Sequence, residues 1–350
     1  MRGGRHRDGA RPGPKAGRRA QRLHGSRRAV STRIAAATIG MMALVGCATA
    51  GTPPTSETGP SAAGSATGPE AAQTTPTSSP EWRSSDALTA HPADETDAPL
   101  PFYEYLPPGY GDGDLRPLLV ALHGFDGGGD GSATGLQNLF ETGIPTLIQD
   151  DEWPEDRPFV VLMPQHGNVP GPGAAEPFAA CNDQTPFIGS CVTEIQHALG
   201  NPEGGSPCMT PSEVHDFLAW AVSAYQVDPN RVYLTGLSCG GYAAYEYVAQ
   251  YGGNEISAMV PIAADARWAW EAAGCDLGLV PIWAFQGDAD DVLRPSDHIE
   301  PLTALADCPQ PPRQDVKLTV YPGVDHGSWI GTYDLTAGND IYAWLLDHTR

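Results

Sequence analysis

The chain has 350 residues and a formal net charge of −22 at neutral pH. Eleven of its 20 Lys and Arg residues precede Gly46, so the rest of the chain is still more acidic and holds a single lysine, Lys317. Phosphate contacts need Lys and Arg, and this balance therefore argues against nucleic acid as a ligand. It is typical of a protein that stays soluble in an exterior medium.

Residues 1–46 predict a signal peptide. A basic segment precedes an apolar run, Ile34 to Val45, that is too short to span a bilayer comfortably. The run leads into residues 44–47, which resemble the lipobox of bacterial lipoproteins, so we expect lipidation of Cys47 to be the protein's only contact with a membrane. Cleavage near Ala50 by an ordinary signal peptidase is the alternative, and the protein would then be secreted. Both the general and the twin-arginine export routes remain open.

Residues 47–85 predict a flexible tether. They consist largely of Ala, Gly, Ser, Thr and Pro and can bury too little apolar surface to offset the entropy of ordering. Residues 86–350 are then the folded domain, which is long enough for one substantial core. A tether after a lipidated cysteine fits a domain displayed at the cell surface.

Six short apolar runs, each bounded by turn-forming residues, predict buried parallel strands. They span residues 117–122, 158–163, 231–234, 258–262, 281–285 and 317–321. Helices are predicted at 210–225, where Thr210 and Glu213 form a capping box, and at 242–251 and 341–348. Strands that alternate with helices indicate an α/β fold, with a doubly wound, mainly parallel sheet covered on both faces.

The segment between residues 164 and 208 is rich in Pro, Gly and Cys, shows no periodicity and predicts an irregular insertion held by disulfides. The cysteines after the lipobox are Cys181, Cys191, Cys208, Cys239, Cys275 and Cys308. Six cysteines allow fifteen pairings, and the sequence does not choose among them. We expect Cys275 to pair with Cys308 and two cysteines of the insertion to pair with each other. Cys239 then bonds the third or stays free.

Ser238 lies in a G-x-S-x-G pentad between a predicted strand and a predicted helix. In that context a sharp turn exposes the serine oxygen above the sheet. A serine nucleophile needs a base and an acid that orients the base. These would follow at the ends of the later strands, where three aspartates, Asp288, Asp290 and Asp291, and then His326 occur. The pattern predicts a serine hydrolase.

Five segments in the same order resemble the α/β-hydrolase superfamily. Within it, the chain is similar to esterases related to polyhydroxybutyrate depolymerases and to phospholipase/carboxylesterase-type enzymes. The segments are "YLPPGYGDGDLRPLLVALHG", "VDPNRVYLTGLSCGGY", "PIWAFQGDADDV", "VYPGVDHGSW" and "IYAWLL", and the likeness covers residues 100–349. The family's G-D-x-D block implies that Asp290 is the triad acid, beside Ser238 as nucleophile and His326 as base. The family usually has His-Gly at Gln286–Gly287, a departure that we expect not to touch the triad.

The same resemblance implies an oxyanion hole. The family's His-Gly motif matches His123–Gly124, so the backbone N–H groups of Phe125 and Cys239 would hold the developing negative charge. The glycine-rich stretch 126–131 lacks the alternating acids and closing Glu of a calcium loop, and we expect it to belong to the oxyanion loop.

The remaining histidines give no metal-binding signal. His166, His197, His215 and His298 lack ligand spacing and are expected on polar loop or helix surfaces, and His123 is expected to be structural. We expect neither a metal nor a cofactor.

Three tryptophans are candidate substrate-binding residues, because they follow strand ends where open α/β sheets bind ligands. They are Trp329, Trp268 and Trp270, and core packing is the alternative for each.

We therefore expect a monomeric, cofactor-independent enzyme that cleaves small or polymeric carboxylic esters. A peptidase with the same triad and a non-catalytic surface-binding module are the alternatives. The sequence does not distinguish polyester, feruloyl and lipid ester substrates.

Overall fold

A computed structural model describes residues 87–350 except 94, 142, 168–176, 183, 203–204 and 310–314. The predicted signal peptide, Cys47 and the tether lie outside these residues. The strands are β1 (Leu88–His91), β2 (Phe102–Tyr105), β3 (Arg116–Leu122), β4 (Val160–Pro164), β5 (Val227–Leu237), β6 (Ala258–Ile262), β7 (Ile282–Gly287) and β8 (Val316–Tyr321). The α-helices are α1 (Ile144–Gln149), α2 (Ile188–Ala198), α3 (Pro211–Ala224), α4 (Cys239–Tyr251), α5 (Arg267–Ala273), α6 (Pro295–Ala306), α7 (Trp329–Tyr333) and α8 (Ile341–Leu346). Short 3-10 helices are η1 (Phe125–Gly127), η2 (Gly135–Glu141), η3 (Phe178–Ala180) and η4 (Gly274–Leu279).

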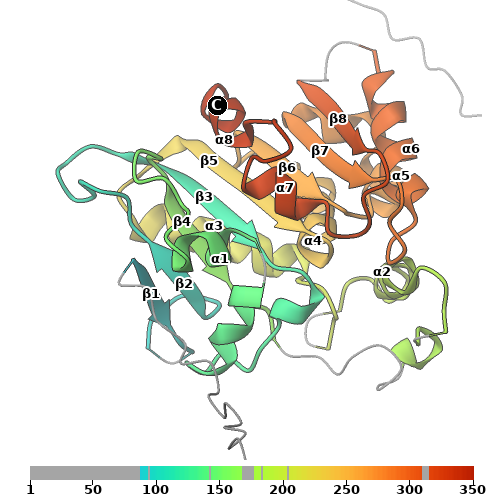
Figure 1. The fold of residues 1–350 in the computed structure, drawn as a ribbon, viewed down its shortest axis with the longest axis horizontal. Coiled ribbons are helices and arrows are strands. Elements are labelled where there is room, and N and C mark those ends of the chain that lie inside the picture. Colours follow the sequence, from blue (N-terminus) through green and yellow to red (C-terminus); the bar gives the residue numbers. More distant parts are fainter. Residues whose placement is uncertain are drawn as a thin grey trace, which may run out of the picture. The chain divides into compact units, whose positions relative to one another are not determined.

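Within the described residues, the strands form one eight-stranded sheet in the order β1-β2-β4-β3-β5-β6-β7-β8 (Figure 1). The six strands from β4 to β8 in this order are mutually parallel, whereas β2 pairs antiparallel with both β1 and β4. The parallel strands are the six that the sequence predicts. The antiparallel edge, β1 and β2, was not predicted, because each strand has only four residues and mixes apolar with polar side chains.

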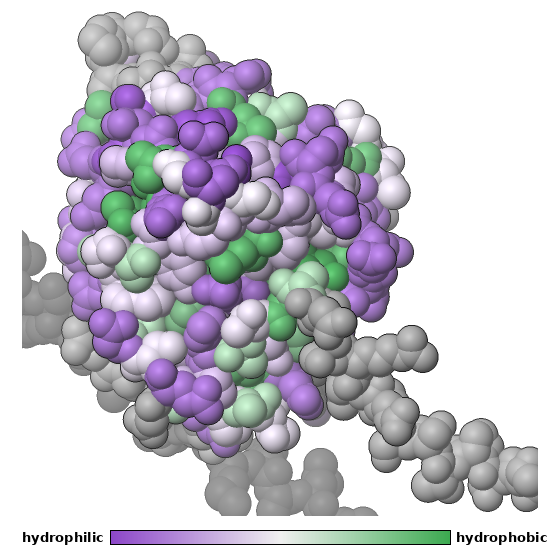
Figure 2. All heavy atoms as spheres, turned by 90° about the vertical axis from the view of Figure 1, so that its left-hand side faces the viewer, coloured by the Kyte–Doolittle hydropathy of each residue, from purple (hydrophilic) through white to green (hydrophobic). Residues whose placement is uncertain are grey.

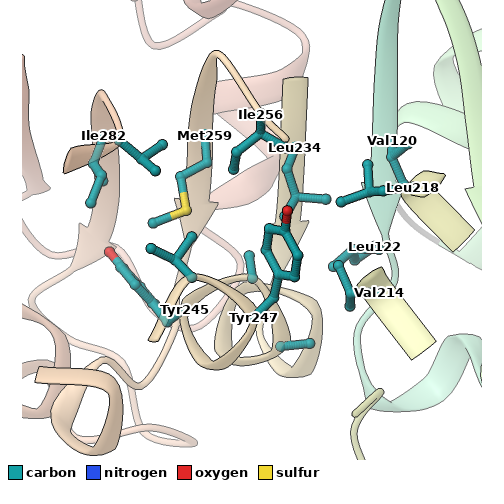
Figure 3. Close-up of a cluster of buried hydrophobic side chains, with 14 of the residues drawn as sticks. Val120, Leu122, Val214, Leu218, Leu234, Tyr245, Tyr247, Ile256, Met259 and Ile282 are labelled. Atoms are coloured by element: carbon teal, nitrogen blue, oxygen red, sulfur yellow. The ribbon is translucent and has the colours of Figure 1, made fainter. Parts of the chain in front are cut away.

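Two apolar cores lie on opposite faces of the sheet. Successive side chains of a strand point to opposite faces, so Leu118 and Val120 of β3 enter one core and Leu119 enters the other. Helices α3, α4, α5 and α6 cover the first face, and α1 and α8 cover the second. Figure 3 shows part of the first core, where Leu234 and Met259 of neighbouring strands face α4. The predicted doubly wound architecture is confirmed.

The bounds of the elements depart from the predictions in instructive ways. Helix α3 begins as predicted, with the Thr210–Glu213 capping box formed and Pro211 in the first turn. Strand β5 is longer than the predicted range 231–234, because it also includes residues 227–230 before that range and 235–237 after it. Helix α4 begins at Cys239, directly after Ser238, rather than at residue 242, since glycines at positions 240 and 241 concealed the start of the helical pattern.

The insertion between residues 164 and 208 was expected to be irregular, but part of it is helical. It contains α2, an eleven-residue helix, and the short helix η3. Cys181 bonds Cys191 within the insertion, and Cys275 bonds Cys308, as predicted. The alternative left open for Cys239 is resolved by its bond to Cys208. Three disulfides indicate an extracytoplasmic protein, because such bonds persist in oxidising compartments.

The surface reflects the acidic composition. Figure 2 shows a face that is mainly hydrophilic, on which apolar residues form small separate patches. Among the described residues, no helix combines the length and apolarity needed to cross a membrane.

Candidate active site

Ser238 occupies the sharp turn between β5 and α4. Its backbone φ of 52° and ψ of −116° are unusual for a residue with a side chain, and they aim Oγ away from the strand. The turn needs glycine on both sides. A Cβ at Gly236 would lie 2.4 Å from the carbonyl carbon of Gly240, and a Cβ at Gly240 would lie 2.3 Å from the Leu122 oxygen. The glycines at positions 236 and 240 therefore allow the tight turn that places Ser238 at the end of the sheet.

Two hydrogen bonds join the three predicted triad residues. His326, in the loop after β8, places Nε2 at 3.0 Å from Ser238 Oγ. Its other nitrogen, Nδ1, lies 2.8 Å from Oδ2 of Asp290, which follows β7. Because an ionised carboxylate only accepts, Nδ1 carries the proton and Nε2 is free to accept from the serine hydroxyl. Three residues from distant parts of the sequence thus meet at the carboxyl ends of β5, β7 and β8.

Asp290 is buried and held from several sides. Its Oδ1 accepts hydrogen bonds from the backbone N–H groups of Val292 (2.9 Å) and Leu293 (2.8 Å). Burial raises the pKa of Asp290, but the hydrogen bond and charge of His326 and the bonds from Leu293 and Gln286 outweigh it and leave the pKa below its usual value. The carboxylate is therefore ionised at neutral pH. Neighbouring Asp288 instead accepts from the Gly323 N–H at 2.6 Å.

Gln286 contacts the triad, contrary to expectation. Its Nε2 donates to Asp290 Oδ2 at 2.9 Å, so this oxygen receives hydrogen bonds from both Gln286 and His326. The sequence concealed the contact, because it depends on the turn after β7 folding back onto the strand end. The carbonyl of Gly287 accepts a second bond from the same Nε2 at 3.1 Å, which fixes the amide.

The predicted oxyanion donors lie on two loops beside Ser238. Phe125 begins η1 and Cys239 begins α4, and the first N–H group of a helix has no acceptor within the helix. Both residues line the same cavity as Ser238. The glycine-rich loop is held by buried Gln165, whose Nε2 donates to the carbonyls of Gly127 (3.0 Å) and Gly135 (2.7 Å). No local sequence pattern indicates these contacts of Gln165.

A mostly apolar cavity of about 230 Å³ opens around Ser238 and His326. Helix α2 supplies one wall, and Trp329 supplies another, with its ring centre 5.0 Å from that of His326. The lining residues are His123, Gly124, Phe125, Asp126, Gly127, Asn138, Leu139, Ile188, Gly189, Val192, Thr193, Leu237, Ser238, Cys239, Val292, Leu293, His326 and Trp329. The insertion thus forms part of the site, a role that could not be predicted from the sequence.

Polar contacts dock α2 against the domain. Ser190 donates to Asp297 Oδ2 at 2.7 Å, and Thr193 donates to Asp265 Oδ2 at 2.6 Å. Arg267 lies between the two carboxylates, with Nη2 at 2.7 Å from Asp265 and 3.2 Å from Asp297. All four uncharged or acidic side chains are buried. Their hydrogen bonds fix α2 at a set distance from the catalytic serine.

Of the three predicted substrate-binding tryptophans, the described lining of the cavity includes Trp329 but not Trp268 or Trp270. Trp268 and Trp270 both lie on helix α5 and pack against other parts of the domain. Trp268 stacks on His197, with ring centres 4.6 Å apart, and packs near the Cys208–Cys239 disulfide. Trp270 packs against the core on the α3 and α4 face, as the alternative reading held.

The histidines outside the triad have structural partners, and the expected surface position is wrong for two of them, His166 and His298, which are buried. His166 contacts Glu213, and His215 contacts Glu255, each at 3.0 Å. Burial lowers the pKa of His123 to about 4, although its hydrogen bond to the Gly124 carbonyl acts in the opposite direction. His123 accepts from the backbone N–H of His166 and so ties the two strand ends together. The described part of the chain has no cluster of three or more His, Cys, Asp or Glu residues suited to a metal ion.

Solved structures with the same topology include a thermostable esterase with 25% sequence identity and a TM-score of 0.53, a match that covers 76% of this chain and 64% of the esterase. The chain has the α/β-hydrolase fold. A putative dienelactone hydrolase from Klebsiella pneumoniae has 14% identity and a TM-score of 0.46, over 74% of this chain and 98% of the other. An S-formylglutathione hydrolase from Agrobacterium tumefaciens has 16% identity and a TM-score of 0.46, over 75% and 95% of the two chains.

In the α/β-hydrolase fold a nucleophile occupies the turn between a central strand and the following helix, which is the position of Ser238 here. The chain spans less than two thirds of the length of the esterase. No protein-family model and no curated protein matches the sequence.

Proposed function

We propose that the protein is an exported serine hydrolase that cleaves carboxylic esters with Ser238, His326 and Asp290. The observation that carries this proposal is the unbroken hydrogen-bonded line from Ser238 Oγ through His326 to Asp290, at the wall of an apolar cavity. A buried carboxylate, an imidazole and a serine in this order are the parts that acyl transfer requires.

In the first half of the reaction, Ser238 Oγ attacks the carbonyl carbon of the ester and its proton passes to His326 Nε2. Asp290 holds the ring by its Nδ1–H and stabilises the positive charge that forms on it. The backbone N–H groups of Phe125 and Cys239 hold the oxyanion, and each such donor contributes about 3 kcal/mol to lowering the barrier. His326 then gives its proton to the departing alcohol, which leaves an acyl group on the serine.

In the second half, a water molecule takes the place of the alcohol. His326 Nε2 accepts a proton from the water as its oxygen attacks the acyl carbon, and it returns that proton to Ser238 Oγ as the acid departs. Every proton in this cycle passes through one nitrogen. The protein's own groups complete the reaction.

The cavity favours a compact, apolar acyl group. Its apolar walls include Leu, Ile, Val, Phe and Trp side chains, and its volume of about 230 Å³ is below the roughly 300 Å³ at which pockets for drug-sized ligands begin. The likeness to a thermostable esterase supports ester rather than amide cleavage.

We further propose that the N-terminal segment directs export and that lipid on Cys47 anchors the enzyme. Palmitate labelling of the wild type and of Cys47→Ser would test the anchor.

The test is hydrolysis of p-nitrophenyl butyrate by the purified protein, followed through the first turnover. We expect a burst of p-nitrophenol equal to the enzyme concentration and its loss in Ser238→Ala, with kcat down by a factor on the order of 10⁴ or more. Ser223→Ala is the control, because Ser223 lies on the exposed face of α3 and bonds only locally to the Trp220 carbonyl. Equal turnover by Ser238→Ala would overturn the proposal, and cleavage of peptide substrates but not esters would redirect it to a peptidase.

A further inference from the structure

A chain of buried hydrogen bonds runs from helix α4 to the triad carboxylate. Tyr245 Oη lies 2.9 Å from His298 Nε2, and His298 Nδ1 lies 3.0 Å from Gln286 Oε1. Gln286 Nε2 completes the chain at 2.9 Å from Asp290 Oδ2. All four side chains are buried. The chain therefore joins the helix that begins beside Ser238 to the carboxylate that orients His326.

The direction of every bond in this chain follows from Asp290. An ionised carboxylate only accepts, so the Gln286 amide must present its NH₂ group to Asp290 and its oxygen to His298. That oxygen requires a proton on His298 Nδ1, which leaves Nε2 as an acceptor for the Tyr245 hydroxyl. The backbone N–H of Ala264 also approaches Nδ1, at the longer distance of 3.4 Å. The shorter contact to Gln286 and the charge on Asp290 fix the tautomer.

The environment of His298 keeps it neutral, as this arrangement requires. Complete burial lowers the pKa of His298 to about 3, although the charge of Asp290 acts in the opposite direction. A neutral imidazole has one donor and one acceptor. The donor, Nδ1–H, is matched by Gln286 and the acceptor, Nε2, by Tyr245. The amide of Gln286 therefore cannot flip without breaking its hydrogen bonds to both His298 and Asp290.

We propose that Gln286, His298 and Tyr245 are positioning residues that hold the Asp290 carboxylate in the orientation that His326 needs. The inference rests on the proposed function, because it assigns the chain to the hydrolytic triad. Gln286 acts directly on Asp290 Oδ2, the oxygen that accepts the hydrogen bond from His326 Nδ1–H, and Tyr245 acts through His298 by fixing its tautomer. A misplacement of about 1 Å at a catalytic group can cost a hundredfold in rate.

Helix α4 offers a matched pair of variants. Tyr245 and Tyr247 are both fully buried, and each hydroxyl makes one side-chain hydrogen bond, to His298 and to Glu255 respectively. Figure 3 shows both rings rising from α4 toward the sheet, Tyr245 on the side of Ile282 and Tyr247 beneath Leu234. Tyr245→Phe and Tyr247→Phe therefore remove the same group from the same helix, but only the first breaks the chain to Asp290.

The experiment measures kcat and KM for p-nitrophenyl butyrate in the wild type, Gln286→Met, Tyr245→Phe and Tyr247→Phe. We expect kcat to fall roughly ten- to a hundredfold in Gln286→Met and about tenfold in Tyr245→Phe, with KM within twofold. Tyr247→Phe should stay within twofold of the wild type in both. Urea unfolding shows whether the two tyrosine variants lose similar stability, which separates positioning from folding.

A second readout needs no substrate. The proton between His326 Nδ1 and Asp290 gives a downfield proton resonance, which should move or broaden in Gln286→Met and Tyr245→Phe and stay in place in Tyr247→Phe. If this resonance and kcat are unchanged in both variants, the inference is overturned and the proposed function stands. If the wild type cleaves no ester, the proposed function fails, and the resonance alone then decides the inference: movement supports it and constancy overturns it.

Discussion

The sheet and the insertion are stabilised in different ways. The sheet buries two continuous apolar cores, one on each face, into which alternate side chains of every parallel strand point. The described residues of the insertion form a small buried cluster of Phe178, Cys181 and Val192 and contribute Cys208 to another. It depends instead on two disulfides and on the hydrogen bonds of Ser190 and Thr193 to buried aspartates.

This difference in stabilisation matches the different parts that the sheet and the insertion contribute to the site. Apolar burial is non-directional and tolerates variation, and it is sufficient to bring Ser238, Asp290 and His326 to the same edge of the sheet, at the ends of β5, β7 and β8. A cavity wall must lie at a defined distance from the serine. Hydrogen bonds are directional, so they can define that distance. Under the proposed function, the insertion would then help to specify the substrate, on a scaffold that carries the chemistry.

The largest expected effect comes from a matched pair of disulfides. Cys208–Cys239 and Cys275–Cys308 join residues 31 and 33 positions apart, so chain entropy assigns each roughly 3–4 kcal/mol of stability. Replacing either pair by alanine should lower the free energy of unfolding, measured in urea, by similar amounts. Only the Cys208→Ala/Cys239→Ala protein should also lose at least tenfold in kcat/KM, because it frees the insertion beside the oxyanion donor at residue 239.

The control for that experiment is the second double variant, Cys275→Ala/Cys308→Ala, which lies outside the cavity lining given above. Equal kcat/KM in the two double variants would show that the insertion does not need its covalent link to keep the cavity wall in place.

A smaller, local effect is expected from Thr193→Val. The change keeps the shape of the side chain but removes the bond to Asp265, and hydrogen bonds to charged groups contribute about 1.5–3 kcal/mol. Hydrogen exchange of the α2 amides should accelerate accordingly, while exchange of the β5 and β6 amides stays the same. Thr235→Val is the counterpart in the sheet, since its hydroxyl donates to the Val260 carbonyl at 2.7 Å. Its effect should appear in β5 and β6; uniform acceleration by both variants would contradict local docking.

The smallest expected effect is on selectivity. Ile188 lines the cavity from α2, and Ile188→Phe should lower kcat/KM for p-nitrophenyl octanoate relative to the acetate by about tenfold, because it shortens the space for the acyl chain. Ile188 and Ile195 both pack against the small cluster of the insertion, but of the two the described cavity lining includes only Ile188. Ile195→Phe should leave the ratio unchanged. A ratio altered equally by both changes would show that α2 does not contact the acyl chain.

The fold was predictable because its signals are local. Continuous apolar runs reveal strands that are buried on both faces, and the Thr210–Glu213 capping box reveals the start of a helix. The four-residue edge strands gave no such signal. Helix α2 was missed because Gly189, Ser190 and Cys191 open it and Pro-rich sequence precedes it, so that tertiary docking rather than propensity stabilises it.

The candidate site divides in the same way. The strand-end residues Ser238, Asp290 and His326 were predictable, because motif and topology together place them. The contact of Gln286 with Asp290 was not, since it depends on how a turn folds back. The tryptophans of α5 were assigned to the cavity from their place in the sequence, but the rotation of a helix about its axis decides which side chains reach it.

The most direct test of the central claim is the identity of the residue that becomes covalently modified. The protein is treated with a fluorophosphonate, which reacts with activated serines, then digested, and the adduct is located by mass spectrometry. We expect one adduct, on Ser238, formed at a rate that falls steeply in His326→Ala. An adduct on another residue, or ester hydrolysis that continues after Ser238 is fully labelled, would contradict the central claim.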